Sequence, residues 1–159
     1  MLLFKNLLFA VIAPGTVSVY VPLLLAHKRS PASGLVFLFA LALLALGGAI
    51  YVRCVWDFAT FGRGTPAVFD APKKLVVRGL YCYVRNPMYV GILALVLGWA
   101  VMFQVLALFV YAFGVGVLFH LFVVLYEERH LGRLYGSAYP EYCAKVNRWL
   151  PRFRQRWVQ

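Results

Sequence analysis

A long apolar run from Met88 to Tyr126 constrains this chain more than any other feature, and Gln104 is the only strongly polar residue in its first half. A single helix over the whole run would be about 58 Å long, nearly twice the ~30 Å thickness of the hydrocarbon core of a bilayer. The run must therefore fold back on itself. Met102 to Val105 is the predicted turn, which makes residues 87–127 a helical hairpin.

Two shorter apolar blocks precede this hairpin, from about Asn6 to Ala26 and from about Ser33 to Val52. Each is long enough to cross a bilayer as a helix, which needs roughly 20 apolar residues. The composition agrees, since 64% of the residues are hydrophobic and 13% are charged, whereas ordinary soluble domains are about 25% charged. We therefore expect an all-α membrane protein with about four transmembrane helices.

The expected organisation is a single integral membrane domain over residues 1–159. Its parts are two N-terminal spans (1–58), a cytoplasmic loop (59–86), the hairpin (87–127) and an amphipathic cytoplasmic C-terminal segment (128–159). Of the 16 Lys and Arg residues, all but Lys28 and Arg29 fall on the side that holds both termini, together with all five acidic residues. Because Lys and Arg concentrate on the cytoplasmic side, we expect a multi-pass protein with both termini and the functional site facing the cytoplasm.

The formal net charge of +11 is high enough to raise nucleic acid as a partner. Here the basic residues flank apolar spans, so membrane lipids are the expected partners and no nucleic acid is expected. The three cysteines, Cys54, Cys82 and Cys143, lack the spacing of a disulfide framework or of a metal site. We expect no metal, and the oligomeric state stays open.

The stretch from Gly79 to Gly91 leads into the hairpin and carries the first candidate site. Asn86 before Pro87 predicts a helix that begins at Pro87, because Asn is a favoured N-cap and Pro suits the first helical position. The free N–H groups of that helix, with Arg85 beside them, suit a carboxylate or phosphate. The alternative is a plain helix cap followed by an interfacial belt of Tyr81, Tyr83 and Tyr89.

Glu127 and Glu128 follow the apolar run directly and carry the second candidate site. We expect them at the C-terminal end of a helix, where acids oppose the helix dipole. One alternative is that they are simply solvated, with Arg129 and Arg133 as partners. The hairpin, however, brings the start of its first helix beside the end of its second, so Asn86 and Glu127 are predicted neighbours. Together the two stretches suit a zwitterionic ligand.

Three further features have both a structural and a functional interpretation. The C-terminal segment from Leu134 to Pro151 is either an interfacial helix or a cap over the site from which Arg148 reaches inward. Gly91 and Gly98 share one helix face and allow either close packing or room for a ligand. His120 is expected to form a hydrogen bond to a neighbouring helix rather than to bind a metal or haem.

These two stretches resemble the membrane methyltransferases of the isoprenylcysteine carboxyl methyltransferase and phospholipid methyltransferase superfamily. The resemblance covers about residues 75–152, and Asn86 stands where the family has histidine, as Tyr135 stands where it has phenylalanine. The matching residues are Gly79, Tyr81, Arg85, Pro87, Tyr89 and Gly91, then Glu127, Glu128, Leu131, Gly136, Tyr139, Tyr142, Arg148 and Pro151.

The resemblance implies methyl transfer from S-adenosyl-L-methionine to a lipophilic acceptor that enters from the bilayer. The acceptor would be the carboxylate of a prenylcysteine-like compound or a lipid amine. Arg148 and Glu127 would be catalytic, with Arg148 orienting the acceptor. The residues implied in cofactor binding are Tyr83, Arg85, Asn86, Pro87, Tyr89, Gly91, Glu127, Glu128, Tyr139 and Tyr142.

Two other functions remain open at this point. A related membrane reductase of the sterol type has a similar hairpin but uses a nicotinamide cofactor; this chain is short for that group, and its Glu pair fits the methyltransferases better. A small structural or transport protein without catalysis is the second alternative. Its spans offer few polar residues for a water-lined path, mainly Thr16, Ser18, Gln104 and His120.

Overall fold

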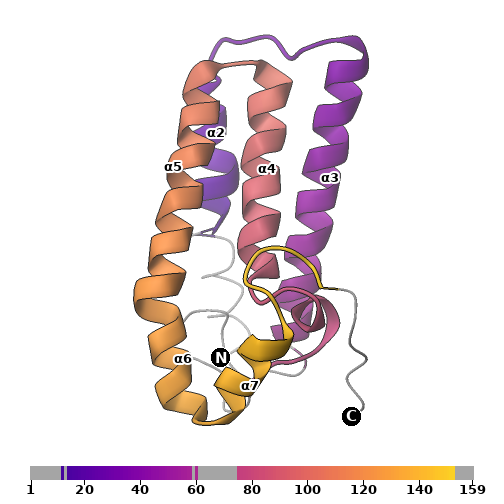
Figure 1. Ribbon diagram of the computed structural model, residues 1–159. Coiled ribbons are helices and arrows are strands. Elements are labelled where there is room, and N and C mark those ends of the chain that lie inside the picture. Colours follow the sequence, from indigo (N-terminus) through magenta and orange to yellow (C-terminus); the bar gives the residue numbers. More distant parts are fainter. Residues whose placement is uncertain (1–11, 13, 59, 61–74, 153–159) are drawn as a thin grey trace.

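The computed structural model describes residues 12, 14–58, 60 and 75–152, and within these ranges the regular structure is helical. Four helices lie side by side, and two short helices gather at one end of them (Figure 1). In chain order the elements are η1 (Thr16–Tyr20), α2 (Val21–Leu25), α3 (Gly34–Asp57), η4 (Gly79–Cys82), α4 (Pro87–Phe103), α5 (Leu106–Phe122), η5 (Val123–Glu127), α6 (Glu128–Tyr135) and α7 (Ala138–Lys145).

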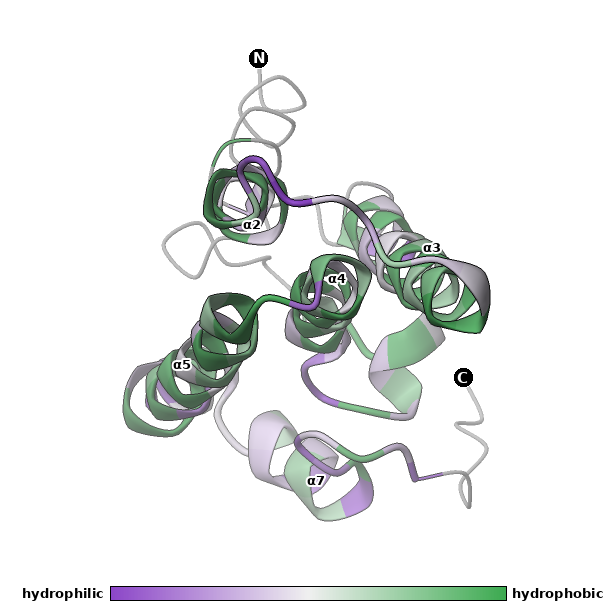
Figure 2. Cartoon of the chain, turned by 90° about the horizontal axis from the view of Figure 1, so that it is seen from above, coloured by the Kyte–Doolittle hydropathy of each residue, from purple (hydrophilic) through white to green (hydrophobic). Residues whose placement is uncertain are grey.

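Helix α4 occupies the middle of the bundle, with α2, α3 and α5 around it and α7 below (Figure 2). Gln104 and Val105 form the turn between α4 and α5, inside the stretch that the sequence predicts. Gln104 adopts a left-handed conformation with φ of 51°, and its N–H donates to the Ala100 carbonyl at 2.9 Å. The hairpin therefore closes over two residues, which keeps α4 and α5 in contact.

Two helices in the described part are long and apolar enough to cross a membrane, Gly34–Asp57 and the continuous helix Leu106–Tyr135. Thr16–Leu25 and Pro87–Phe103 are apolar but shorter. Large apolar side chains such as Leu35 and Phe113 are more than three-quarters exposed on the outer faces, as expected for contact with lipid. The expected beginning of the first span, and most of the 59–86 loop, lie outside the described residues.

Glycines bring α3 and α4 into close contact. A Cβ added to Gly47 would lie 2.7 Å from the Gly91 carbonyl oxygen, and one added to Gly98 would lie 2.8 Å from the Leu44 side chain. Gly91 itself faces Gly47 and Ile50. Of the two interpretations of Gly91 and Gly98, the structure therefore supports helix packing, in the small-residue manner of membrane helices.

Pro22 explains how the N-terminal helix is attached to the bundle. Proline has no N–H, so the carbonyl of Ser18, four residues earlier, loses its usual helical donor. Trp99 supplies a replacement through its indole N–H at 2.9 Å, and the Tyr111 hydroxyl donates to the neighbouring Val17 carbonyl at the same distance. The backbone carbonyls of this segment are thus hydrogen-bonded to side chains of α4 and α5.

The Glu pair does not end a helix, contrary to the sequence expectation. The helix continues from α5 through the π-helical turn η5 into α6, and it stops at Gly136, whose φ is +56°. Glycine at such a position is a common helix terminator. Glu127 and Glu128 therefore lie within a continuous helix, so the dipole argument does not apply to them.

Candidate active site

Arg85, Glu128 and Arg148 form a charged cluster at the end of the bundle that carries α6 and α7 (Figure 1). Arg148 makes a two-pronged contact with Glu128, with Nε 2.7 Å from Oε1 and Nη2 2.9 Å from Oε2. Arg85 Nη1 lies 3.0 Å from the same Oε1. Paired hydrogen bonds between charged groups are strong and directional, so one carboxylate fixes both guanidinium groups.

A thiol that the sequence did not single out belongs to this cluster. Arg85 Nη1 donates to Cys143 Sγ at 2.8 Å, in addition to Glu128. Among the described residues, the buried Nε of Arg85 has no hydrogen-bond partner. Cys143 directly follows Tyr142 of the recognised pattern, which is the one signal in the sequence that could have drawn attention to it.

Asn86 occupies the N-cap position of α4, as predicted, but its side chain does not cap the helix. Its Nδ2 instead donates to the backbone carbonyl of Arg148 at 3.1 Å. The predicted capping role is therefore wrong, because the C-terminal segment offers an acceptor to the same amide. Asn86 holds the backbone that carries Arg148 in place.

Glu127 lies beside the charged cluster in a different environment. The Tyr89 hydroxyl donates to its Oε2 at 2.9 Å, and within the described ranges Glu127 forms no ion pair. The Tyr89 ring contacts Phe119, with centroids 4.6 Å apart, and lies 6.5 Å from the ring of Trp149. One carboxylate of the pair is thus neutralised by arginines, and the other is bordered by aromatic rings.

The C-terminal segment closes one side of this site by pairing with the stretch before α4. The N–H of Arg85 donates to the Asn147 carbonyl at 2.9 Å, and the N–H of Arg152 donates to the Tyr83 carbonyl at 3.0 Å. Tyr83 therefore contributes its backbone, and the residue as a whole is 44% exposed. Of the two interpretations of the C-terminal segment, the structure supports the cap, because α6 and α7 are followed by a strap, residues 146–152, from which Arg148 reaches Glu128.

Tyr139 and Tyr142 of α7 are buried beneath the charged cluster, in a core with Val146. The Tyr142 hydroxyl donates to the Tyr81 carbonyl at 2.7 Å. Burial raises the pKa of Tyr81, Tyr139 and Tyr142 above its usual value. These tyrosines are therefore neutral hydrogen-bonding groups at physiological pH, and they hold α7 against η4.

A buried carboxylate that the sequence does not predict, Asp57, lies at the end of α3. It is fully buried, and among the described residues its oxygens have no hydrogen-bond partner, although Arg53 lies 3.4 Å away. Gly79 packs directly against it with φ of +58°, so neither its backbone nor the space suits a side chain. This contact explains the glycine that opens the recognised motif.

The structure brings most of the predicted site residues together, with two exceptions. Gly91 faces α3 rather than the charged cluster. Pro87 is buried as the first residue of α4 and serves the helix start. The residues that do share one region are Tyr83, Arg85, Asn86, Tyr89, Glu127, Glu128, Tyr139, Tyr142 and Arg148.

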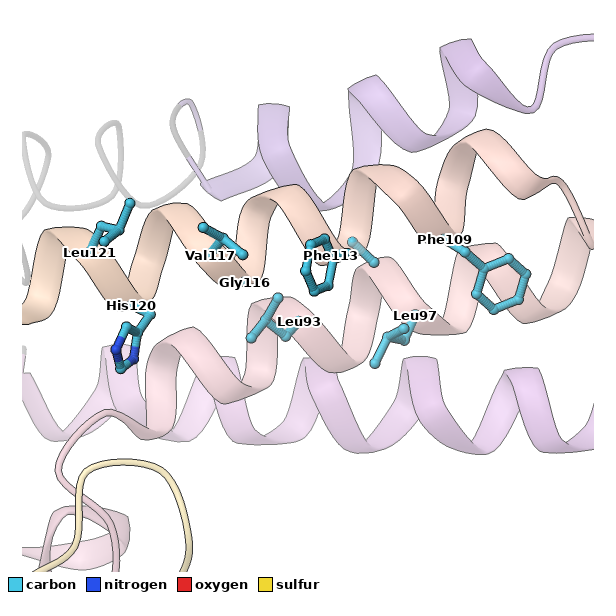
Figure 3. Close-up of a pocket in the computed structure, with 9 residues that line it drawn as sticks. Leu93, Leu97, Phe109, Phe113, Gly116, Val117, His120 and Leu121 are labelled. Carbon is cyan, nitrogen blue, oxygen red and sulfur yellow. The ribbon is translucent and has the colours of Figure 1, made fainter.

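An apolar groove of about 470 Å³ runs along α4 and α5 and ends near this region (Figure 3). His120 lines its end, and the Trp149 indole donates to His120 Nδ1 at 3.2 Å. The hydrogen bond of His120 therefore goes to the C-terminal strap and not, as predicted, to a neighbouring helix. The site as a whole combines guanidinium groups, the Glu127 carboxylate, which forms no ion pair among the described residues, and an apolar groove. This combination suits a ligand with both charged and hydrocarbon parts.

The match to a known family agrees with this chemistry. A sequence model of a protein family, described as phospholipid methyltransferase, matches residues 35–138, from α3 to the first residue of α7. No individual curated protein matches the chain. The matched region is well over half of the 159 residues and contains Arg85, Asn86, Tyr89, Glu127 and Glu128. The chain belongs to the phospholipid methyltransferase family.

Proposed function

We propose that this membrane methyltransferase uses S-adenosyl-L-methionine to methylate a lipophilic acceptor at the cytoplasmic face. The observation that carries the proposal is the single Glu128 carboxylate shared by Arg85 and Arg148 beside Glu127. Two guanidinium groups and one carboxylate leave one positive charge, while Glu127 supplies a negative group nearby. The amino-acid part of the cofactor carries one carboxylate and one ammonium, so this donor set fits it.

In this proposal each polar group of the site has a separate role. Arg85 binds the cofactor carboxylate, and Glu127 binds its ammonium group with the help of the Tyr89 hydroxyl. Glu128 is a positioning residue, because it holds both arginines. Arg148 orients the acceptor, and Asn86 fixes the backbone of Arg148. Tyr83, Tyr139 and Tyr142 support the wall from which these groups project.

When bound, S-adenosylmethionine would supply a methyl group to which the acceptor nucleophile bonds as the carbon–sulfur bond of the sulfonium breaks and S-adenosylhomocysteine leaves. Such a reaction needs alignment of the reacting atoms more than acid or base catalysis. Asn86 agrees with this requirement, since an amide neither gains nor loses a proton near neutral pH. The chain's contribution is to hold charged ends in place and to bring the acceptor from the lipid.

The proposed topology has four transmembrane helices with α6, α7 and both termini in the cytoplasm. Its support is the charge distribution, because Lys28 and Arg29 follow α2 at the end of the bundle opposite α6 and α7 (Figure 1). The short helix Pro87–Phe103 lies at the centre of the bundle. Its neighbours shield it from lipid on several sides, so it need not match the full bilayer thickness.

Calorimetry with S-adenosylhomocysteine tests the proposed site in purified wild type, Glu128→Ala and Glu141→Ala. We expect wild type to bind and Glu128→Ala to bind at least tenfold more weakly, which corresponds to about 1.4 kcal/mol. Glu141 is an exposed acid in the first turn of α7 and should behave as wild type. Equal binding by all three proteins would refute the assigned site, and no binding by folded wild type would refute the proposed cofactor.

A further inference from the structure

The groove between α4 and α5 has the length and chemistry of a binding site for one hydrocarbon chain. Its lining extends along α5 from Phe109 to Leu121, which is about 18 Å at the helical rise of 1.5 Å per residue. This is a little more than half of the ~30 Å hydrocarbon core, the depth occupied by a chain in one leaflet. Ala112 and Gly116 are small residues in its lining, and Leu93 and Leu97 line it from α4 (Figure 3).

The two ends of the groove differ in polarity. Phe109 lies at one end, and His120 is the only polar residue among its lining residues in the described part of the chain. His120 Nδ1 accepts the Trp149 indole N–H at 3.2 Å, so in the neutral imidazole the proton resides on Nε2. That N–H is a donor for an ester, carboxylate or phosphate oxygen at the cytoplasmic end.

The polar end of the groove is connected to the candidate active site. Trp149 contacts His120, with ring centroids 6.2 Å apart, and its ring lies 6.5 Å from that of Tyr89. Tyr89 in turn donates to Glu127. A headgroup held at His120 is therefore next to the residues proposed to bind the cofactor, while the chain extends from it into the groove.

We propose that this groove binds one hydrocarbon chain of the methyl-acceptor lipid, with the headgroup at His120 and the chain end near Phe109. This inference rests on the proposed function and specifies where the acceptor lies. It commits to a lipid chain because the lining is apolar, is open to the bilayer and leads into the site. The competing outcome is that bulk bilayer lipids cover this face of the protein and that the groove binds no particular chain.

Photo-crosslinking tests the occupant in nanodiscs of dioleoylphosphatidylcholine. The probe is a small fraction of phosphatidylethanolamine with a diazirine in one 16-carbon chain, and labelled residues are mapped by mass spectrometry. We expect Phe113 and Leu97 to be labelled at least tenfold more than Val110 and Leu118, which are more exposed than Leu97 but do not line the groove. Equal labelling of all four residues would show that only bulk bilayer lipid contacts them, and it would overturn the proposal.

The position of the diazirine tests the orientation. A diazirine near the headgroup should label Leu121 and His120, and one near the chain end should label Phe109. The reverse pattern would overturn the orientation.

A matched pair of glycine variants tests the groove itself. Gly116→Leu should fill the groove, because among the described residues a Cβ there meets only Leu93, at an ordinary 3.7 Å. Gly114→Leu is the control, since an added Cβ on the same helix meets nothing within 4 Å in the described part of the chain and the residue lies outside the groove. We expect Gly116→Leu to reduce labelling of Leu97 at least tenfold and Gly114→Leu to leave it unchanged. Equal labelling in both variants would overturn the proposal.

Cofactor binding separates this inference from the proposed function. Gly116→Leu should bind S-adenosylhomocysteine as wild type does, because Gly116 lies away from the charged cluster. Failure of wild type to bind it would refute the proposed function, whatever the cross-linking shows. Normal binding together with even cross-linking would refute the acceptor groove alone.

Discussion

The Glu128 carboxylate links the two arginines of the site, because it accepts hydrogen bonds from both guanidinium groups at once. Its hydrogen bonds to Arg148 raise the pKa of that arginine above its usual value. Arg148 therefore remains charged, and its guanidinium group is fixed by hydrogen bonds to the Glu128 side chain rather than by hydration. Glu127 has a tyrosine as its partner instead, so two adjacent acids of the sequence have different electrostatic surroundings.

Tyr142 links α7 to the stretch before α4, and its burial predicts a specific response to alkaline pH. Tyrosines of the unfolded chain ionise near pH ~10, whereas burial raises the pKa of Tyr142 in the folded protein. The folded state then binds more protons than the unfolded state above about pH 10. The free energy of unfolding should therefore be unaffected below that pH and fall above it, by at most about 1.4 kcal/mol per pH unit for this residue.

Thermal unfolding of Tyr142→Phe in detergent checks this prediction. The variant should be less stable than wild type near neutral pH, because the Tyr81 carbonyl loses its donor, a loss of about 1–3 kcal/mol. Its stability should then decline less steeply above about pH 10 than that of wild type. Tyr20→Phe is the control, since that ring is 68% exposed. Equal slopes in Tyr142→Phe and wild type would contradict the assignment.

At the level of residues, the sequence predicted which charged groups meet but not how they pair. The hairpin and the helix start at Pro87 were enough to bring Arg85 and Asn86 beside the Glu pair. The partner of each group depends on the C-terminal strap, whose path follows from backbone contacts such as Arg85 to Asn147. No local pattern encodes that path, so the contacts of Cys143 and of the Asn86 amide were not predicted.

The packing of α3 against α4 depends on glycine at the level of helices. Gly47→Ala would place a Cβ 2.7 Å from the Gly91 carbonyl oxygen and 2.8 Å from the Leu95 nitrogen. Both are backbone atoms of α4, so the helices must separate to accept the methyl group. We expect a loss of stability of about 1–3 kcal/mol, as for other overpacked sites.

The neighbouring glycine provides a matched control for this prediction. A Cβ on Gly48 meets nothing within 4 Å among the described residues. Gly48→Ala should therefore stabilise the helix by about 0.5–1 kcal/mol through its higher helix propensity. Denaturation in mixed detergent micelles measures both variants, and a similar effect of the two substitutions would contradict the close packing of α3 and α4.

The hairpin could be predicted at the level of helices, whereas the continuation of its second helix could not. Length and apolar character required a fold-back, and Gln104 marked its place. The apolar pattern stops at Glu127 and Glu128, so the sequence predicts a helix end there. The helix instead ends at Gly136, eight residues after Glu128. A glycine that terminates a helix cannot be recognised from composition alone.

For the whole molecule, the distribution of basic residues predicts which end of the bundle faces the cytoplasm. Ser30 lies in the loop between α2 and α3, and Ser137 lies between α6 and α7; both are exposed. In intact cells, a membrane-impermeant maleimide should react with Ser30→Cys. It should react with Ser137→Cys only after the cells have been opened so that the reagent reaches the cytoplasmic face. Wild type measures the background from its native thiols. The opposite labelling pattern would contradict the proposed orientation.

The account as a whole depends on transfer of a methyl group to a lipid, which can be measured directly. Purified protein in nanodiscs made from the lipids of its native membrane is supplied with S-adenosylmethionine carrying a deuterated methyl group, and lipid extracts are analysed by mass spectrometry. We predict a lipid product that carries the deuterated methyl group with wild type and Glu141→Ala, and at least tenfold less of it with Glu128→Ala. Absence of any labelled lipid from wild type that is folded and binds S-adenosylhomocysteine would contradict the central claim.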